Sequence, residues 1–336
     1  MKTIDKPLES IGFYTLYDER ATNSSPTSQM KRCEMIITEA CNFKCPYCRG
    51  LKPEIYSDRQ RKMLSLQEIK TGIDLWCLNG TLENIRFSGG EPTLHPDILA
   101  AVQYAKSKGI KRIAISSNGS NKMELYKKLV EAGANDFSIS LDACCAINGD
   151  KMAGNINKAW EKVVKTISEL SKLTYVTTGV VLTPDNIEET MKIVAYADSL
   201  GVADIRIIPS AQWNKFIDEV KGIPEEILER HPILKYRVSN IREGRHIRGI
   251  TETDANRCYL ALDDSIIAGQ YHFPCVIHMR EGGQPIGKVG PTMRADKVQW
   301  AMSHDTFKDP ICQKNCLDIC IHYNNTCRRI NKFVNA

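Results

Sequence analysis

The sequence has few features that would tie it to a membrane or to nucleic acid. Its apolar segments stay well short of the roughly 20 residues that a transmembrane helix requires. Residues 1–18 mix charges with isolated apolar side chains, unlike a secretory signal peptide. The net charge of +5 is slight for 336 residues and does not favour nucleic-acid binding. We therefore expect a cytoplasmic protein with no membrane or nucleic-acid partner.

The cysteine content, by contrast, is high at 13 residues. A cytoplasmic chain keeps its thiols reduced, so metal binding is a better interpretation than a disulfide framework. Cys41, Cys45 and Cys48 are closely spaced on one short segment. Three such soft thiolates can hold three irons of a [4Fe–4S] cluster and leave the fourth iron open. Zinc is the alternative, but it would need a fourth ligand, and the nearest spare cysteine, Cys33, falls on the expected strand before the segment.

A second motif, Gly89-Gly90-Glu91-Pro92, follows the next apolar run. Glycines at a strand end let the backbone come close to a ligand, although the same residues also suit an ordinary strand-to-helix turn. The cysteine segment, with an aromatic residue before its last cysteine, and this glycine motif together resemble the radical S-adenosylmethionine (radical SAM) superfamily. The resemblance implies a [4Fe–4S] cluster and S-adenosylmethionine as cofactors, with the glycine loop holding the methionine amino group.

Strand and helix patterns alternate through the first part of the chain. Short apolar or β-branched runs predict strands at 33–38, 84–88, 113–117, 137–141, 175–182 and 204–209. Three- and four-residue apolar spacing predicts helices at 66–78, 96–108, 123–132, 158–173 and 187–200. Alternation of this kind implies right-handed crossovers and a parallel sheet. We predict an α/β fold, a partial (βα)6 TIM-like barrel.

Polar residues follow or lie within the predicted strands, and barrel active sites lie at the carboxyl ends of strands. Such residues are also common in turns and caps. The radical SAM resemblance implies that they contact the carboxylate, ribose and adenine of S-adenosylmethionine, with the tyrosine of the cysteine segment beside the adenine. The predicted cofactor-binding residues outside the glycine motif are Tyr47, Ser117, Asn118, Ser140, Asp142 and Arg206.

Six further cysteines fall near the C-terminus: Cys258, Cys275, Cys312, Cys316, Cys320 and Cys327. Residues 264–275 read as strand, glycine turn and strand, a hairpin that delivers its last cysteine as a ligand. This arrangement resembles the SPASM and Twitch extensions of radical SAM enzymes, which bind auxiliary [4Fe–4S] clusters. We predict an N-terminal extension (1–30), the barrel (31–210), a helical linker (211–257) and a small cysteine-rich α+β auxiliary module (258–336).

One auxiliary cluster is favoured over two, because the late cysteines depart from the full SPASM pattern. If their segment is helical, Cys312, Cys316 and Cys320 share one face, which suits a single ligand better than three. The predicted ligands are Cys258, Cys275, Cys316 and Cys327, with Cys312 and Cys320 as alternatives. Zinc is the alternative metal here too, because four thiolates serve either.

The resemblance implies an enzyme that reductively cleaves S-adenosylmethionine to a 5′-deoxyadenosyl radical and abstracts a substrate hydrogen. The main hypothesis is oxidative modification or crosslinking of a ribosomally made peptide. The alternative is a dehydrogenase, cyclase or rearrangement enzyme acting on a small molecule such as a sugar, cyclitol or nucleotide. An electron carrier would have no use for the barrel. Cys144 and Cys145 are candidates for returning a hydrogen atom to the substrate, or else are small buried residues.

Two further expectations concern partners and relatives. The resemblance implies a flavodoxin or ferredoxin as electron donor, with Lys44 and Arg49 as plausible contacts beside the ligands. Peptide-modifying relatives often carry a leader-binding segment before the barrel, for which residues 1–30 are too short. Molybdenum-cofactor cyclases have similar barrel motifs but end in Gly-Gly, whereas this sequence ends in Phe333-Val334-Asn335-Ala336.

Overall fold

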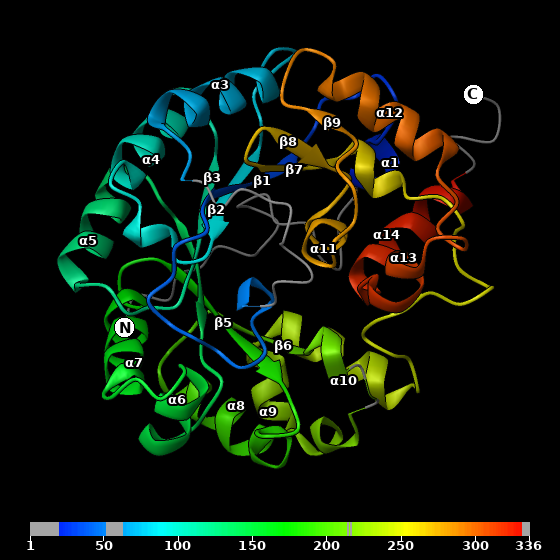
Figure 1. The fold of residues 1–336 in the computed structure, drawn as a ribbon. Helices are drawn as coiled ribbons and strands as arrows, with labels where there is room; N and C mark the ends of the chain where they lie inside the picture. The colour runs from blue at the N-terminus through cyan, green and yellow to red at the C-terminus, as the bar shows by residue number, and fades with distance from the viewer. Residues whose placement is uncertain (1–19, 52–62, 214, 216, 331–336) are drawn as a thin grey trace.

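The computed structural model describes residues 20–51, 63–213, 215 and 217–330. Most of the predicted N-terminal extension and the last six residues lie outside this part of the chain. Six strands alternate with helices that form an outer ring around them (Figure 1). The strands are β1 Arg32–Thr38, β2 Asn84–Gly89, β3 Arg112–Ser117, β4 Asp136–Ser140, β5 Tyr175–Leu182 and β6 Asp204–Pro209. Their positions agree with the prediction to within about two residues.

The ring consists of α3 Leu66–Trp76, α4 Ile98–Ser107, α5 Met123–Ala132, α6 Ala146–Met152, α7 Ala159–Leu170 and α8 Thr190–Ser199. The sequence reading missed α6, which is short. Helix α3 starts with a capping box, in which the Ser65 hydroxyl accepts from the Glu68 amide and the Glu68 carboxylate accepts from the Ser65 amide. Apolar side chains of the ring pack against the sheet and form one large core.

All six strands run parallel, and the sheet does not stop at β1. Its order is β6-β5-β4-β3-β2-β1-β7-β8-β9, where β7 is Asp264–Ala268, β8 is Tyr271–Phe273 and β9 is Gly287–Lys288. Strand β7 pairs in parallel with β1, and β8 and β9 continue antiparallel. The predicted hairpin over residues 264–275 is therefore present, and it joins the cysteine-rich part to the barrel through one continuous sheet.

Side chains along the strands alternate between the helix-covered face and the barrel interior. On β1 and β2, Met35 and Phe87 are paired in register, fully buried and part of the core. The neighbouring pair, Glu34 and Arg86, lies on the opposite face. The interior of the barrel is consequently lined with polar and charged side chains, which is unusual for a packed core and suits a binding site.

The remaining segments cover the open side of the barrel. The short helices η5 Ala211–Trp213, η6 Asp218–Gly222, α9 Glu225–Arg230 and α10 Pro232–Arg242 follow β6. The cysteine-rich part contributes η7 Tyr259–Leu262, α11 Val276–Arg280, α12 Met293–Ser303, α13 Pro310–Asn315 and α14 Asp318–Arg329. Helix α1 Arg20–Asn23 contacts α14, so the two ends of the described chain meet (Figure 1). None of the described helices combines the length and apolar character needed to cross a bilayer.

Candidate active site and metal centres

The cysteine segment forms a loop directly after β1. Cys41 is exposed, whereas Cys45 and Cys48 are half-buried and joined by a turn in which the Cys48 amide donates to the Cys45 carbonyl at 2.9 Å. Burial, together with the nearby groups Asp142, Cys48 and Cys41, raises the pKa of Cys45 to about 12. Because the thiols lie close enough to repel one another as anions, a bound cation would favour their ionised form. Three soft thiols on one loop fit a [4Fe–4S] cluster.

The glycine motif holds this loop in place. Gly89 has a positive φ of 139°, and a Cβ there would lie 2.0 Å from the Thr38 carbonyl oxygen. At Gly90 a Cβ would lie 2.3 Å from the Ala40 oxygen. The Gly90 amide donates to Thr38 and the Glu91 amide to Ala40, both at 2.8 Å. The end of β2 is therefore clamped against the residues that precede Cys41, and only glycine allows this approach.

Glu91 connects the glycine motif with the end of β3. Its carboxylate is fully buried and accepts from the Thr93 amide and hydroxyl (3.0 and 2.6 Å), the Ser117 hydroxyl (2.8 Å) and the Asn118 amide (2.6 Å). Burial raises its pKa, and these hydrogen bonds oppose the shift. Pro92 begins the short helix η3 Pro92–Leu94 and is also buried. The side chains of Glu91 and Ser117 are thus engaged in hydrogen bonds within the protein.

Other predicted cofactor residues gather beside the thiols. The Tyr47 hydroxyl donates to Asp142, and the Val181 amide donates to the second oxygen of the same carboxylate at 2.7 Å. Burial raises the pKa of Asp142 to about 6 despite these bonds. The side-chain amide nitrogen of Asn118 lies 3.8 Å from the Cys41 sulfur. Ser140 is exposed at the end of β4. The fold therefore brings groups from the loop, β3 and β4 to one mouth of the barrel.

Arg206 lies deeper, in the middle of β6 opposite Gly179. Its guanidinium donates to the Ser138 hydroxyl at 3.2 Å. Burial, together with the neighbouring cations Arg86, Arg237 and Arg280, lowers the pKa of Arg206 to about 9.

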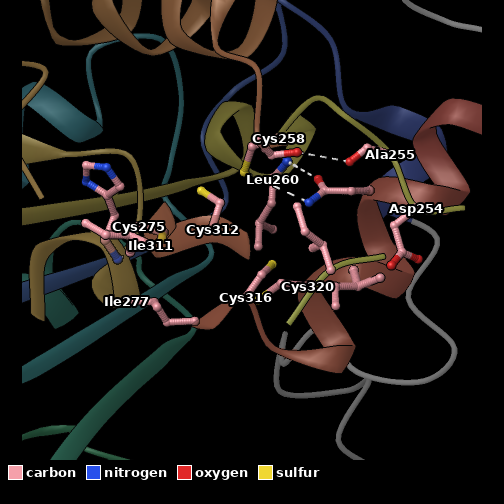
Figure 2. A pocket seen from close by; sticks show the side chains of 15 residues that line it. Asp254, Ala255, Cys258, Leu260, Cys275, Ile277, Ile311, Cys312, Cys316 and Cys320 are labelled. Carbon is pink, nitrogen blue, oxygen red and sulfur yellow. Dashed lines mark hydrogen bonds between the residues drawn. The ribbon is translucent and has the colours of Figure 1, made fainter. Parts of the chain in front are cut away.

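A second group of thiols lines a cavity in the C-terminal part (Figure 2). The cavity encloses about 550 Å³, some of it open to solvent. Burial raises the pKa of Cys258 to about 11 and strongly raises that of Cys275 and Cys312. The cavity cysteines come from five positions in the chain: Cys258, Cys275, Cys312, Cys316 and Cys320. This set of donors fits an auxiliary cluster with four thiolate ligands.

Cys327, a predicted ligand, is not among the residues that line this cavity. Its side chain is 1% exposed, packs in an apolar cluster with Ala21 and Tyr323, and places its sulfur 3.6 Å from the Ala21 carbonyl oxygen. Near the end of α14 it points into the small core that α1 covers. Cys320, an alternative in the prediction, lies earlier on the same helix and faces the cavity instead.

The expectation that Cys312, Cys316 and Cys320 share a single helical face is wrong. Helix α13 ends at Asn315, Cys316 has an extended backbone, and α14 begins at Asp318. The break lets two helices deliver their thiols to the same cavity. Cys144 is half-buried and packs against the barrel core, which agrees with the simpler interpretation of a small apolar residue.

The comparisons with known proteins agree with this geometry. The fold and the three-thiol loop define a cluster-binding α/β barrel. Residues 35–197, just under half of the chain, match the Radical SAM superfamily. The GTP 3′,8-cyclase of Mannheimia succiniciproducens is 36% identical over 110 residues, 32% of each chain. That of Aquifex aeolicus is 25% identical over 219 residues, 61% of this chain and 68% of the relative. The chain spans only about a third of the length of the Mannheimia relative.

Solved structures share the fold over most of the chain. SuiB of Streptococcus suis bound to S-adenosylmethionine aligns with a TM-score of 0.58 over 84% of this chain and 65% of SuiB, at 13% identity. Native anSMEcpe with bound AdoMet aligns with a TM-score of 0.56 over 90% of this chain and 95% of its own, also at 13% identity. At this identity the likeness extends to the fold alone.

Proposed function

We propose that this chain is a radical SAM enzyme that removes a hydrogen atom from a small anionic substrate of the nucleotide class. Cys41, Cys45 and Cys48 would hold a [4Fe–4S] cluster, and the barrel mouth would hold S-adenosylmethionine. Together these cofactors supply an electron and an organic radical able to abstract hydrogen. The protein's part is to position the reactants and to exclude water from them.

The chain's own residues support that positioning role. Gly89 and Gly90 fix the thiol loop against the end of β2, and Glu91 ties the β2 and β3 ends together. The Tyr47 hydroxyl anchors the same loop to Asp142 at the end of β4. A reactive loop held from three directions keeps its geometry during turnover, as a preorganised site requires.

The observation that carries the substrate class is the half-buried charge of Arg206 in the barrel interior. A guanidinium removed from water costs free energy unless an anion compensates it. The hydrogen-bond partner of Arg206 is the neutral Ser138 hydroxyl. Glu34, the carboxylate that stabilises its charge from further away, already accepts from Ser88 at 2.5 Å and pairs with Arg280 at 3.4 Å. An anionic substrate in the barrel would supply the missing charge.

A further guanidinium, that of Arg248, is buried and also supports an anionic substrate. It is 7% exposed and donates to the carbonyl oxygens of Pro209 (3.0 Å) and Asn315 (3.3 Å), where β6 meets the cysteine-rich part. Burial lowers its pKa to about 10, and Arg49, Arg237 and Arg280 add to the effect. Two guanidinium groups near β6 suit phosphate oxygens, which such groups bind in a bidentate manner.

The curated relatives support the same choice. GTP 3′,8-cyclases act, by their name, on a nucleoside triphosphate. Our main hypothesis, peptide modification, has support only at the level of the fold shared with SuiB. We therefore favour the small-molecule alternative, and place Arg206 against the substrate rather than the cofactor because it lies below the strand ends.

We further propose an auxiliary [4Fe–4S] cluster in the cysteine cavity, and a flavodoxin or ferredoxin as electron donor. Of the two basic residues considered for donor docking, Arg49 forms an ion pair with Glu281, so its charge is compensated. Lys44 is exposed beside the cysteine loop and is the better candidate. An acidic donor would approach this face, where the distance to the first cluster is shortest.

The test is nucleotide binding to the reconstituted enzyme, comparing GTP, GMP and guanosine by calorimetry. We expect affinity to increase with the number of phosphates, and Arg206→Gln to weaken GTP binding by about 30-fold or more while leaving S-adenosylmethionine binding unchanged. Arg242→Gln, which alters an exposed arginine paired with Glu225, is the control. Equal affinity for GTP and guanosine would refute the anionic-substrate proposal. If Arg206→Gln loses S-adenosylmethionine binding, Arg206 contacts the cofactor rather than the substrate, as predicted from the sequence.

A further inference from the structure

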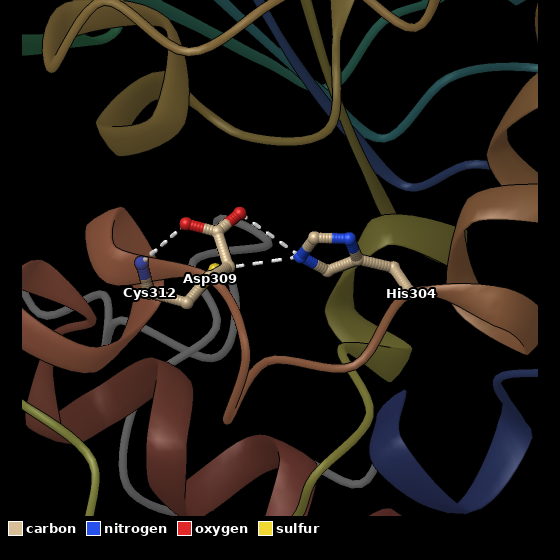
Figure 3. Close-up of side chains that lie close together, drawn as sticks. All are labelled: His304, Asp309 and Cys312. Carbon is tan, nitrogen blue, oxygen red and sulfur yellow. Dashed lines mark hydrogen bonds and ion pairs between the residues drawn. The ribbon is translucent and has the colours of Figure 1, made fainter.

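A histidine and an aspartate stand beside one of the cavity thiols. His304 follows α12, Asp309 caps α13, and Cys312 lies one turn into α13 (Figure 3). The Nε2 atom of His304 lies 3.0 Å from Oδ2 of Asp309 and 3.9 Å from Sγ of Cys312. All three donor atoms lie within 4.8 Å of one another. A tetrahedral zinc ion with its usual bond lengths places such donors about 3.3–3.7 Å apart, so small shifts would complete the site.

The three groups are already oriented toward one another. One oxygen of Asp309 accepts from the amides of Ile311 (2.7 Å) and Cys312 (3.2 Å), which turns the other oxygen toward His304. Trp300 stacks on the His304 ring with centroids 3.7 Å apart and an angle of 16° between the planes. The ligand side chains are therefore held by packing and hydrogen bonds, as in preformed metal sites.

A fourth side chain, His278, supports the carboxylate. Its Nε2 lies 3.2 Å from the same oxygen of Asp309 that faces His304. The ring is 7% exposed and packs edge-on against Trp300. It also packs closely on Gly283, where a Cβ would lie 2.1 Å from Nδ1. Such a partner fixes the orientation of a ligating carboxylate and commonly affects metal affinity.

The number of cavity thiols also supports a metal site separate from the cluster. Five cysteines line the cavity, but a four-iron cluster has four corners for protein ligands. Of the five, Cys312 belongs to the one set of His, Cys, Asp and Glu donors in the described residues that lies close enough to share a single ion. Cys316 and Cys320 interact with each other through their thiols. Cys312 also lies near Cys258 and Cys275, and it is the cavity thiol that has nitrogen and oxygen donors beside it.

We propose that His304, Asp309 and Cys312 bind one divalent transition-metal ion, for which zinc is the best match. Mixed sulfur, nitrogen and oxygen donors in tetrahedral geometry suit zinc. Three protein ligands leave a fourth position for water or an anion, the arrangement of zinc sites that act on a ligand rather than only stabilise the fold. The metal site stands on this geometry alone, whereas the assignment of the other four thiols rests on the proposed auxiliary cluster.

The test uses the full chain, reconstituted anaerobically with iron and sulfide in the presence of one equivalent of zinc and then freed of unbound metal. We expect about eight irons and one zinc per chain, with X-ray absorption at the zinc edge reporting one sulfur and otherwise lighter ligands. Cys312→Ser and His304→Gln should each lose zinc and keep the iron. His278→Gln should weaken zinc binding by about 10- to 100-fold.

Two matched variants separate this proposal from the cluster. Cys316→Ser should lose about four irons and keep the zinc, and Cys327→Ser should keep both metals. Three outcomes would overturn the zinc site. The wild type could lack zinc, its zinc signal could report four sulfur ligands, or Cys312→Ser could lose four irons. About four irons with a one-sulfur zinc signal would instead refute the auxiliary cluster and leave the zinc site intact.

Discussion

The phenol oxygen of Tyr47 lies 2.5 Å from a carboxylate oxygen of Asp142, and this contact joins the cysteine loop to the end of β4. Both residues were predicted at the cofactor site, but their direct contact could not be inferred from positions almost a hundred residues apart. The contact ties the first metal centre to the barrel mouth. Because Asp142 is buried, its ionisation also makes the stability of this region depend on pH.

Asp142→Asn should change how stability depends on pH. The folded pKa of Asp142, about 6, lies above the usual aspartate value of about 3.9, so this group stabilises the fold less as pH rises between these two values. Relative to the wild type, we expect the Asn variant to gain about 2–3 kcal/mol of stability from pH 4 to pH 7. Urea unfolding of the metal-free chain at several pH values measures this. A constant difference between the two proteins would show that burial does not shift this pKa.

Replacing Cys41, Cys45 and Cys48 together with Ala should remove one cluster and leave the second. We expect about eight irons per chain in the wild type and four in the variant. Reductive cleavage of S-adenosylmethionine to 5′-deoxyadenosine should occur in the wild type alone, because the variant lacks all three proposed ligands of the first cluster. Iron and sulfide analysis with a product assay tests both points. Four irons in the wild type and none in the variant would place all the iron on the first loop.

Gly90→Ala should displace the cysteine loop although it alters no ligand. The new methyl group would lie 2.3 Å from the Ala40 oxygen, which is too close, so the clamp on the loop must open. We expect a loss of about 2–3 kcal/mol in unfolding free energy and a defect in the iron of the first cluster. Gly222→Ala is the control, since nothing lies within 4 Å of its added methyl group. If both variants behave alike, the close approach is not what requires glycine.

Cys320→Ser and Cys327→Ser should have opposite effects. The first removes a cavity thiol and should lower the iron content by about four, while the second changes a thiol in an apolar core and should leave it unaltered. Burying a hydroxyl in place of Cys327 should instead cost about 1–2 kcal/mol of stability. Iron analysis and thermal unfolding of both variants distinguish these effects. Loss of iron in Cys327→Ser alone would restore the ligand set predicted from sequence.

The barrel was largely predictable because its signals are local. Each strand is a short apolar run, each main helix repeats its apolar residues every three or four positions, and these patterns need no knowledge of distant contacts. Helix α6 was missed because its seven residues are too few to establish a period. The pairing of β7 with β1 was also not predictable, since it joins segments more than two hundred residues apart in the sequence.

The proposed first metal centre and the order of strands and helices were determined by the sequence alone, because Cys41, Cys45 and Cys48 are neighbours on one loop and spacing by itself brings them together. The second centre was decided by the tertiary structure. The break between α13 and α14 turns Cys312, Cys316 and Cys320 toward one cavity, while the packing of α1 removes Cys327 from it. Helix ends and long-range packing set these directions, and no local pattern encodes them.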